Sequence, residues 1–154
     1  MKIAFDENIP PVLVKVFCAL AREGNILKAD IVSAREYAVP AAKSDVPWLE
    51  AFAKDGGKVV ISGDKGMRSN LHEQQALRDA GFLVFFFEPR WNQQDPFTKS
   101  AILLKWWPAI QRAIRKTKKA GQFFEIPFAW NTDELKVVTE FLFAKYSIPI
   151  FSLI

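Results

Sequence analysis

The first eleven residues, MKIAFDENIPP (residues 1–11), set the pattern from which the fold can be predicted. Residues 2–5 are mostly apolar and typical of a short buried strand. Asp6, Glu7 and Asn8 follow this strand directly, and Pro10-Pro11 suits the first turn of a helix, where a missing N–H costs nothing. The chain is therefore expected to begin with a strand that leads at once into a helix, with two carboxylates at the junction.

The same alternation continues along the chain. Apolar runs predict further strands at residues 30–33, 58–62 and 82–87, separated by helices that end near Gly24, Gly56-Gly57 and Gly81. A longer helix at residues 97–119 with a proline at 108, a strand at 123–128 and a helix at 134–144 complete the predicted order. Strands that alternate with helices predict a three-layer α/β/α fold with a mainly parallel central sheet.

Length and composition are those of a compact globular protein. The 154 residues suit a single domain, half of them are hydrophobic, and 14 are Phe. One cysteine, Cys18, excludes an internal disulfide framework and suits a reducing compartment. No signal peptide is apparent, and no apolar run reaches the roughly 18 residues that a membrane span needs, so we expect a soluble cytoplasmic protein.

Two aspartates follow strands of the predicted sheet where these strands end. Asp6 follows the first strand and Asp64 the third, and the carboxyl ends of parallel strands share the edge of the sheet at which ligands bind. Asp45 begins the helix that returns to the sheet and can face the same edge. Three carboxylates repel one another unless a cation lies among them, and oxygen ligands without His or Cys favour Mg²⁺ or Mn²⁺.

A metal ion held by such carboxylates can polarise a phosphate and lower the pKa of a bound water, which is the chemistry of phosphodiester cleavage. The alternative is purely structural. An Asp just after a strand often caps a turn, and Asp45 can serve only as the N-cap of its helix.

The same residues carry a resemblance to a known family. Residues 3–11 (IAFDENIPP) and 44–87 (SDVPWLEAFAKDGGKVVISGDKGMRSNLHEQQALRDAGFLVFFF) resemble the PIN-like fold. The closer likeness is to the compact PIN-like proteins related to the VapC-type toxins of bacterial toxin–antitoxin pairs. Three motifs match in order and spacing: Asp6 with Asn8, Asp45 with Trp48, and Ser62 with Asp64-Lys65. The resemblance spans residues 2–91, and the basic helix and a C-terminal extension at 123–154 follow it.

The resemblance implies a metal-dependent ribonuclease that acts on single-stranded RNA. On this hypothesis Asp6, Asp45 and Asp64 hold one or two Mg²⁺ or Mn²⁺ ions, and a metal-bound hydroxide attacks the scissile phosphorus. Larger members of the fold carry a fourth acidic ligand, for which this chain has no clear counterpart; Glu7 and Glu36 are the nearest candidates.

Each accessory residue has a functional and a structural interpretation. Lys65 and Arg68 are either phosphate-binding cations or exposed turn charges, while Asn8 and Ser62 can orient the site. Glu73 either extends the acidic site or closes a capping box with Asn70, and its spacing favours the capping box.

Positive charge is concentrated in one later segment. Residues 97–122 carry seven Lys or Arg and no acid, in a chain whose net charge is +4. The spacing puts most of these cations on one helical face, which with Trp106 and Trp107 can form an RNA-binding strip; a solvated face above a buried Trp pair is the favoured alternative. The residues of this basic face are Arg112, Arg115, Lys116, Lys118 and Lys119.

Two functions of different classes follow from these observations. The first is a Mg²⁺- or Mn²⁺-dependent endoribonuclease, the toxin of a toxin–antitoxin pair, whose expected partners are RNA, a protein antitoxin and a second copy of the chain. The second is a non-catalytic PIN-like module that binds RNA or a protein through its basic helix and aromatic tail.

Overall fold

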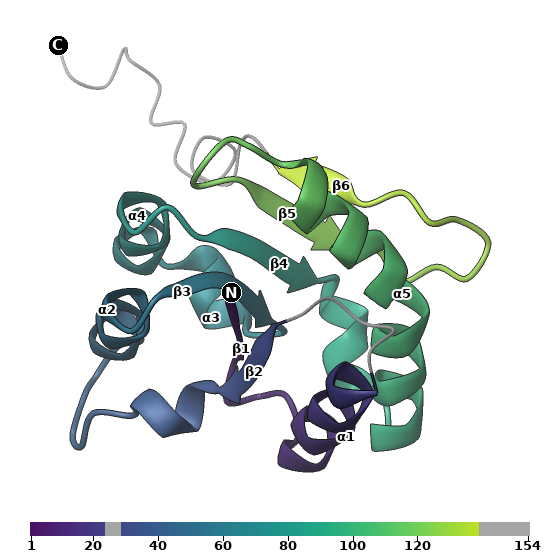
Figure 1. The fold of residues 1–154 in the computed structure, drawn as a ribbon, viewed down its shortest axis with the longest axis horizontal. Helices are drawn as coiled ribbons and strands as arrows, with labels where there is room; N and C mark the ends of the chain where they lie inside the picture. The colour runs from purple at the N-terminus through teal and green to yellow at the C-terminus, as the bar shows by residue number, and fades with distance from the viewer. Residues whose placement is uncertain (24–28, 139–154) are drawn as a thin grey trace, which may run out of the picture.

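The computed structural model describes residues 1–23 and 29–138 of the chain (Figure 1). None of the helices in this part of the chain is both long and apolar enough to cross a membrane. In chain order, the elements are β1 (Lys2–Phe5), α1 (Pro11–Arg22), β2 (Asp30–Ser33), the 3₁₀ helix η1 (Ala34–Tyr37), α2 (Val46–Lys54), β3 (Gly57–Ser62), α3 (Lys65–Ser69), α4 (Leu71–Asp79), β4 (Leu83–Phe87), the 3₁₀ helix η2 (Pro89–Gln93), α5 (Pro96–Lys116), β5 (Phe123–Ile126) and β6 (Lys136–Val138).

A six-stranded sheet of order β2-β1-β3-β4-β5-β6 forms the middle layer. The pairs from β2 to β5 are parallel, and β6 pairs with β5 in the antiparallel direction. Helices α1 and α5 cover one face of the sheet, and α2 and α4 cover the other (Figure 1). The predicted three-layer α/β/α fold with a mainly parallel sheet is therefore confirmed.

Both faces of the central strands are buried, which explains their continuous apolar sequences. In β4, Phe85 and Phe87 contribute to the core beneath α1 and α5, while Val84 and Phe86 contribute to the core beneath α2 and α4. This division follows the two-residue period of a strand. Run lengths and turn residues were enough to predict the first four strands to within one residue of their bounds.

The long helix α5 ends earlier than predicted. It runs from Pro96 to Lys116 with Pro108 inside it, and Thr117 leaves the helical region with φ −81° and ψ 114°. Lys118 and Lys119 therefore follow the helix instead of belonging to its last turn, so the predicted end at residue 119 is wrong.

The predicted helix at residues 134–144 is wrong in the part that the structure describes. Lys136, Val137 and Val138 form β6, with Val137 opposite Phe124 on β5. The open edge of β5 supplies hydrogen-bond partners for this segment, and β-branched valines suit a strand. Residues 139–144 of the predicted helix lie outside the described residues.

Candidate acidic site at the carboxyl edge of the sheet

Asp6 lies directly after β1 and is almost entirely buried, with 3% of its surface exposed. Its backbone N–H still donates to the Ile61 carbonyl of β3, at 3.0 Å. The Asp6 carboxylate accepts a hydrogen bond from the Ser62 hydroxyl at 2.6 Å and one from the Glu7 N–H at 2.6 Å. The Ser62 oxygen also accepts from the Asp64 N–H at 2.9 Å, so Ser62 links the two aspartates that follow β1 and β3.

Burial raises the pKa of Asp6 to about 7, although the Ser62 hydrogen bond opposes this rise. The negative charges of Asp45 and Asp64 raise the pKa of Asp6 further. A carboxylate with little access to water and two anionic neighbours is a group that a bound cation would stabilise in its ionised form.

Asp45 and Glu73 are joined across the gap between α2 and α4. The Asp45 backbone N–H donates to Glu73 Oε1 at 3.2 Å, and the Asp45 carboxylate accepts from the Trp48 indole N–H at 3.0 Å. Asp45 occupies the N-cap position of α2, as the structural interpretation predicted, but its side chain makes no capping hydrogen bond to this helix.

The capping box predicted for Glu73 is wrong as well. Asn70 caps α4 by accepting from the N–H groups of His72 and Glu73, at 3.0 and 3.1 Å. The Glu73 carboxylate instead lies against α2 and is buried. A contact between two helices leaves no mark in the spacing of one of them, so sequence reasoning could not find it.

Four carboxylates line one pocket of about 330 Å³ at this edge of the sheet: Glu7, Asp45, Asp64 and Glu73. Burial raises the pKa of Asp45, and the charges of Asp64 and Glu7 raise it further. Burial also raises the pKa of Glu73, with additional contributions from Asp45 and Asp64. Asp45 and Glu73 thus lie close enough to other carboxylates for their ionised forms to be disfavoured.

These residues fit a divalent cation in donor chemistry. Carboxylate oxygens without His or Cys suit Mg²⁺ or Mn²⁺. Within residues 1–23 and 29–138, however, no group of three or more His, Cys, Asp or Glu side chains is arranged so that it could hold a metal ion. Side chains of the pocket would have to move for Asp6, Asp45 and Asp64 to share one ion.

The two candidates for a fourth acidic ligand, Glu7 and Glu36, differ in their location. Glu7 lines the pocket, whereas Glu36 accepts from the Ser33 N–H at 3.5 Å in a capping box that begins η1. Glu73 also lines the pocket, together with Asp45 and Asp64.

Asn8 supports the turn that carries Asp64. Its side-chain oxygen accepts from the Gly63 N–H at 3.3 Å, and Asn92 donates to the Gly63 carbonyl at 2.6 Å. A Cβ at Gly63 would lie 2.7 Å from the Trp91 ring, so only glycine fits between Ser62 and Asp64. Asn92 and Trp91, which make these contacts with Gly63, belong to η2, and no motif in the sequence predicted their role.

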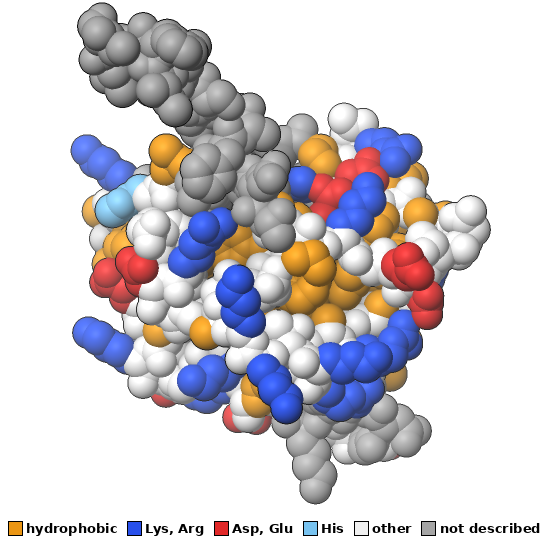
Figure 2. All heavy atoms as spheres, turned by 90° about the horizontal axis from the view of Figure 1, so that it is seen from above, with side chains coloured by type: hydrophobic (Ala, Val, Ile, Leu, Met, Phe, Trp, Pro, Cys, Tyr) orange, Lys and Arg blue, Asp and Glu red, His pale blue; other side chains and the backbone are white. Residues whose placement is uncertain are grey.

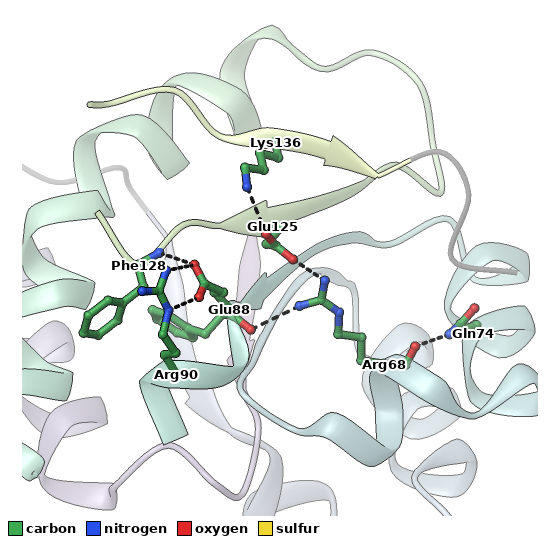
Figure 3. A network of polar contacts seen from close by, with 8 residues as sticks. Arg68, Gln74, Glu88, Arg90, Glu125, Phe128 and Lys136 are labelled. Atoms are coloured by element: carbon green, nitrogen blue, oxygen red, sulfur yellow. Dashed lines mark hydrogen bonds and ion pairs between the residues drawn. The ribbon is translucent and has the colours of Figure 1, made fainter. Parts of the chain in front are cut away.

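Arg68 takes part in a separate polar network (Figure 3). Its guanidinium pairs with Glu125 of β5 and donates to the Phe87 carbonyl at 3.4 Å, while its own carbonyl accepts from Gln74. Lys136 of β6 lies 3.6 Å from the same Glu125 carboxylate. This engagement favours a structural role for Arg68, which ties α3 to β4 and β5. Lys65 begins α3.

The tryptophans predicted to stack on RNA bases are part of the core. Trp106 is 0% exposed and Trp107 4% exposed, so base stacking on either ring is excluded in this conformation. Trp107 packs against Phe17 of α1 with ring centroids 4.7 Å apart. The alternative interpretation, a buried Trp pair beneath a solvated face, is correct.

The basic residues lie at the other edge of the sheet. Helix α5 connects the parallel strands β4 and β5, so it begins at their carboxyl edge and ends at their amino edge. Lys119 lines a hollow with Arg78 of α4 and Val137 of β6, and Arg112 pairs with Asp133 at 2.9 Å. Figure 2 shows Lys and Arg side chains in several separate groups, interrupted by hydrophobic side chains. The basic run therefore does not line the acidic pocket.

Together these features define an α/β protein with acidic side chains gathered at the ligand edge of a parallel sheet. The sequence profile of the PIN-like domain matches residues 1–89, which is more than half of the chain and includes every residue of the acidic pocket. The chain belongs to the PIN-like domain family. No curated protein and no solved structure gave a significant match to it.

Proposed function

We propose that the chain is an endoribonuclease that depends on Mg²⁺ or Mn²⁺, with Asp6, Asp45 and Asp64 as the metal-holding residues. One observation carries this proposal: carboxylates from segments far apart in the sequence surround one pocket at the carboxyl edge of a PIN-like sheet. The raised pKa values of Asp6 and Asp45 are typical of carboxylates in a cation-binding site. PIN-like domains are commonly nucleases, which agrees with this chemistry.

The residues of the chain have separate roles in this proposal. A bound divalent cation would polarise the phosphate and make a water molecule more acidic. Ser62 orients the Asp6 carboxylate by donating to it, and its bond from the Asp64 N–H fixes the turn after β3. Glu73 holds the N-terminal end of α2, which keeps Asp45 at the pocket.

We also propose that the protein acts as the toxin of a toxin–antitoxin pair, with a protein antitoxin as its partner. Helix α1 supports this because Val12, Val16 and Leu20 are exposed at intervals of four residues, 64%, 42% and 37% respectively. Such a stripe lies on one side of a helix and suits the apolar face of a partner helix. A second copy of the chain is the other candidate for this surface.

Cleavage of RNA by the purified protein tests the catalytic proposal. We expect cleavage with Mn²⁺, none with EDTA, and a loss of at least about a hundredfold in the Asp6→Asn/Asp64→Asn variant, because electrostatic stabilisation of a phosphoryl group contributes several kcal/mol. Glu50→Gln is the matched control, since Glu50 is an exposed carboxylate outside the pocket. Equal cleavage by the wild type and the double variant would refute the mechanism.

The toxin role has its own test. Expression of the wild type should arrest growth, while the Asp6→Asn/Asp64→Asn variant should not. Normal growth with the wild-type protein at a verified expression level would contradict the role. A small acidic reading frame beside the gene is the expected source of the antitoxin.

One observation favours the second candidate, a non-catalytic PIN-like module that binds RNA or a protein. The described carboxylates do not form a ready-made metal site, and both Asp6 oxygens accept hydrogen bonds from the protein. Titration of the protein with Mn²⁺ separates the two functions. A module of this kind would bind RNA without measurable Mn²⁺ binding and without cleavage.

A further inference from the structure

The acidic pocket has a second wall, formed by the loop of residues 38–44 between η1 and α2. This loop contributes Ala38, Val39, Ala42, Lys43 and Ser44 to the pocket lining. The residues that flank it contact acidic residues of the pocket: Arg35 of η1 donates to the Glu7 carbonyl at 2.9 Å, and the Asp45 N–H donates to Glu73 at 3.2 Å. The wall is therefore flanked on both sides by contacts with the acidic residues.

A strained turn shapes this loop. The Ala42 N–H donates to the Val39 carbonyl at 3.2 Å, which closes a turn with Pro40 and Ala41 at its centre. Ala41 has φ 61°, the only non-glycine residue with positive φ in the part of the chain that the structure describes. An L-residue in this region costs about 1–2 kcal/mol, and such strain persists where the surroundings impose it. The turn places Lys43 two residues later on the pocket wall.

Lys43 is the cation among the residues that line this pocket, together with four carboxylates. Two other cations near the same edge have partners: Arg68 pairs with Glu125, and Arg90 pairs with Glu88. Across residues 1–23 and 29–138, Lys43 takes part in none of the ion pairs. The Lys43 ammonium is thus available for a ligand of the pocket.

A polyanion that enters this pocket meets a strongly negative surface. A divalent cation neutralises only part of the negative charge of four carboxylates, and the phosphates of an entering RNA strand add further negative charge. A cation in the lining of the same pocket lowers the repulsion. A lysine serves this purpose without sequence preference because it is a compact point charge on a flexible stem.

We propose that Lys43 binds a phosphate of single-stranded RNA at the acidic pocket, an inference that rests on the proposed nuclease function. The contact is ionic and contributes to substrate binding, and no bond to Lys43 is made or broken. The loop of residues 38–44 is therefore a substrate-binding wall, and its strained turn holds Lys43 in place.

The variant Lys43→Ala tests this contact, with Lys54→Ala as the matched control. Lys54 is an exposed lysine in the last turn of α2, whereas Lys43 lies just before the start of that helix. We expect Lys43→Ala to raise KM about fivefold with kcat within about twofold, which is the effect of losing one phosphate contact. Lys43→Arg should retain most of the affinity, and Lys54→Ala should behave as the wild type.

Binding without cleavage gives an independent measurement. In an Asp64→Asn background, RNA binding can be measured by fluorescence anisotropy with a labelled single-stranded RNA. When Lys43 is replaced by Ala, the slope of log K against the logarithm of the salt concentration should decrease in magnitude by about 0.7. Mn²⁺ affinity should stay equal or rise, because removing a cation reduces repulsion of the metal ion.

Unchanged RNA affinity and salt dependence in Lys43→Ala would overturn the inference. A loss of Mn²⁺ affinity would overturn it as well, since Lys43 would then support the metal site. Failure of the proposed function is a different result: Asp6→Asn/Asp64→Asn would cleave RNA as well as the wild type does.

Discussion

At the scale of single residues, Asp6 is the least ordinary carboxylate of the candidate site because a buried carboxylate costs free energy when it ionises. Its pKa of about 7 lies above the 3.8 of an unperturbed aspartate. The folded state therefore binds more protons than the unfolded state between these two pH values, and the folded protein loses stability as the pH rises through this window.

This imbalance predicts how stability depends on pH in the absence of metal ions. With EDTA, the contribution of Asp6 to the free energy of unfolding should fall by about 3 kcal/mol between pH 4 and pH 7. Asp6→Asn removes this contribution and should be more stable than the wild type at pH 7. Urea unfolding of both proteins across the range measures the difference, and parallel pH curves would contradict the prediction.

Gly63 is a second residue whose identity the site requires. Gly63→Ala places a Cβ 2.7 Å from the Trp91 ring and 3.0 Å from Asn8 Nδ2, so the turn before Asp64 must shift. We expect a loss of about 1–3 kcal/mol in the free energy of unfolding, as for other overpacked sites.

A double-mutant cycle with Trp91→Leu identifies the cause of this loss. If the ring is responsible, Gly63→Ala should cost at least about 1 kcal/mol less in the Trp91→Leu background than in the wild type. If Gly63→Ala lowers the free energy of unfolding equally in both backgrounds, the cause is the backbone conformation at Gly63 and not the Trp91 ring.

At the scale of elements, the loop of residues 38–44 shows how local strain and the site are connected. Ala41 adopts a left-handed conformation that glycine would adopt at less cost. Ala41→Gly should therefore raise the free energy of unfolding by about 0.5–1 kcal/mol in chemical denaturation. Ala42→Gly is the control, because Ala42 has no positive φ to relieve, and it should lower stability instead. An Ala41→Gly protein that is no more stable than the wild type would show that the turn is not strained.

The elements also show which parts of the structure sequence reasoning could reach. Strands β1 and β2 were predicted with their observed bounds because turn residues delimit a short apolar run in each case. The segment of β6 was predicted as a helix. It forms a strand because it pairs with the open edge of β5, and the local sequence pattern does not record this pairing. α3 was missed because five residues are too few to show a helical period.

The same limit applies to the site. Asp6 and Asp64 could be predicted at one edge because the position of a residue after a parallel strand is set by topology. The contact of Glu73 with Asp45 joins α4 to α2, and the Arg68–Glu125 pair joins α3 to β5. Such contacts depend on how helices pack against the sheet, which no single motif records. For Trp106 and Trp107, only the apolar residues next to them in the sequence indicated that both side chains belong to the core.

At the scale of the whole molecule, the two charged regions occupy opposite edges of the sheet. The 21 residues of α5 separate them, which corresponds to about 30 Å along the helix axis. The acidic pocket lies at the carboxyl edge of the sheet, the edge at which α5 begins, and the basic run lies where α5 ends. An RNA strand can contact both regions only if it is long enough to cross the molecule.

This separation predicts that substrate length decides which cations matter. The triple variant Arg115→Ala/Lys116→Ala/Lys119→Ala should cleave an RNA of about four nucleotides as fast as the wild type, because so short a strand does not extend about 30 Å from the pocket. Lys43→Ala should slow cleavage of the same short RNA. With an RNA of 30 nucleotides, the triple variant should bind more weakly and with a smaller salt dependence if the long strand reaches the basic run. Equal losses on both lengths would mean that the basic run contributes to the pocket itself, against the topology of α5.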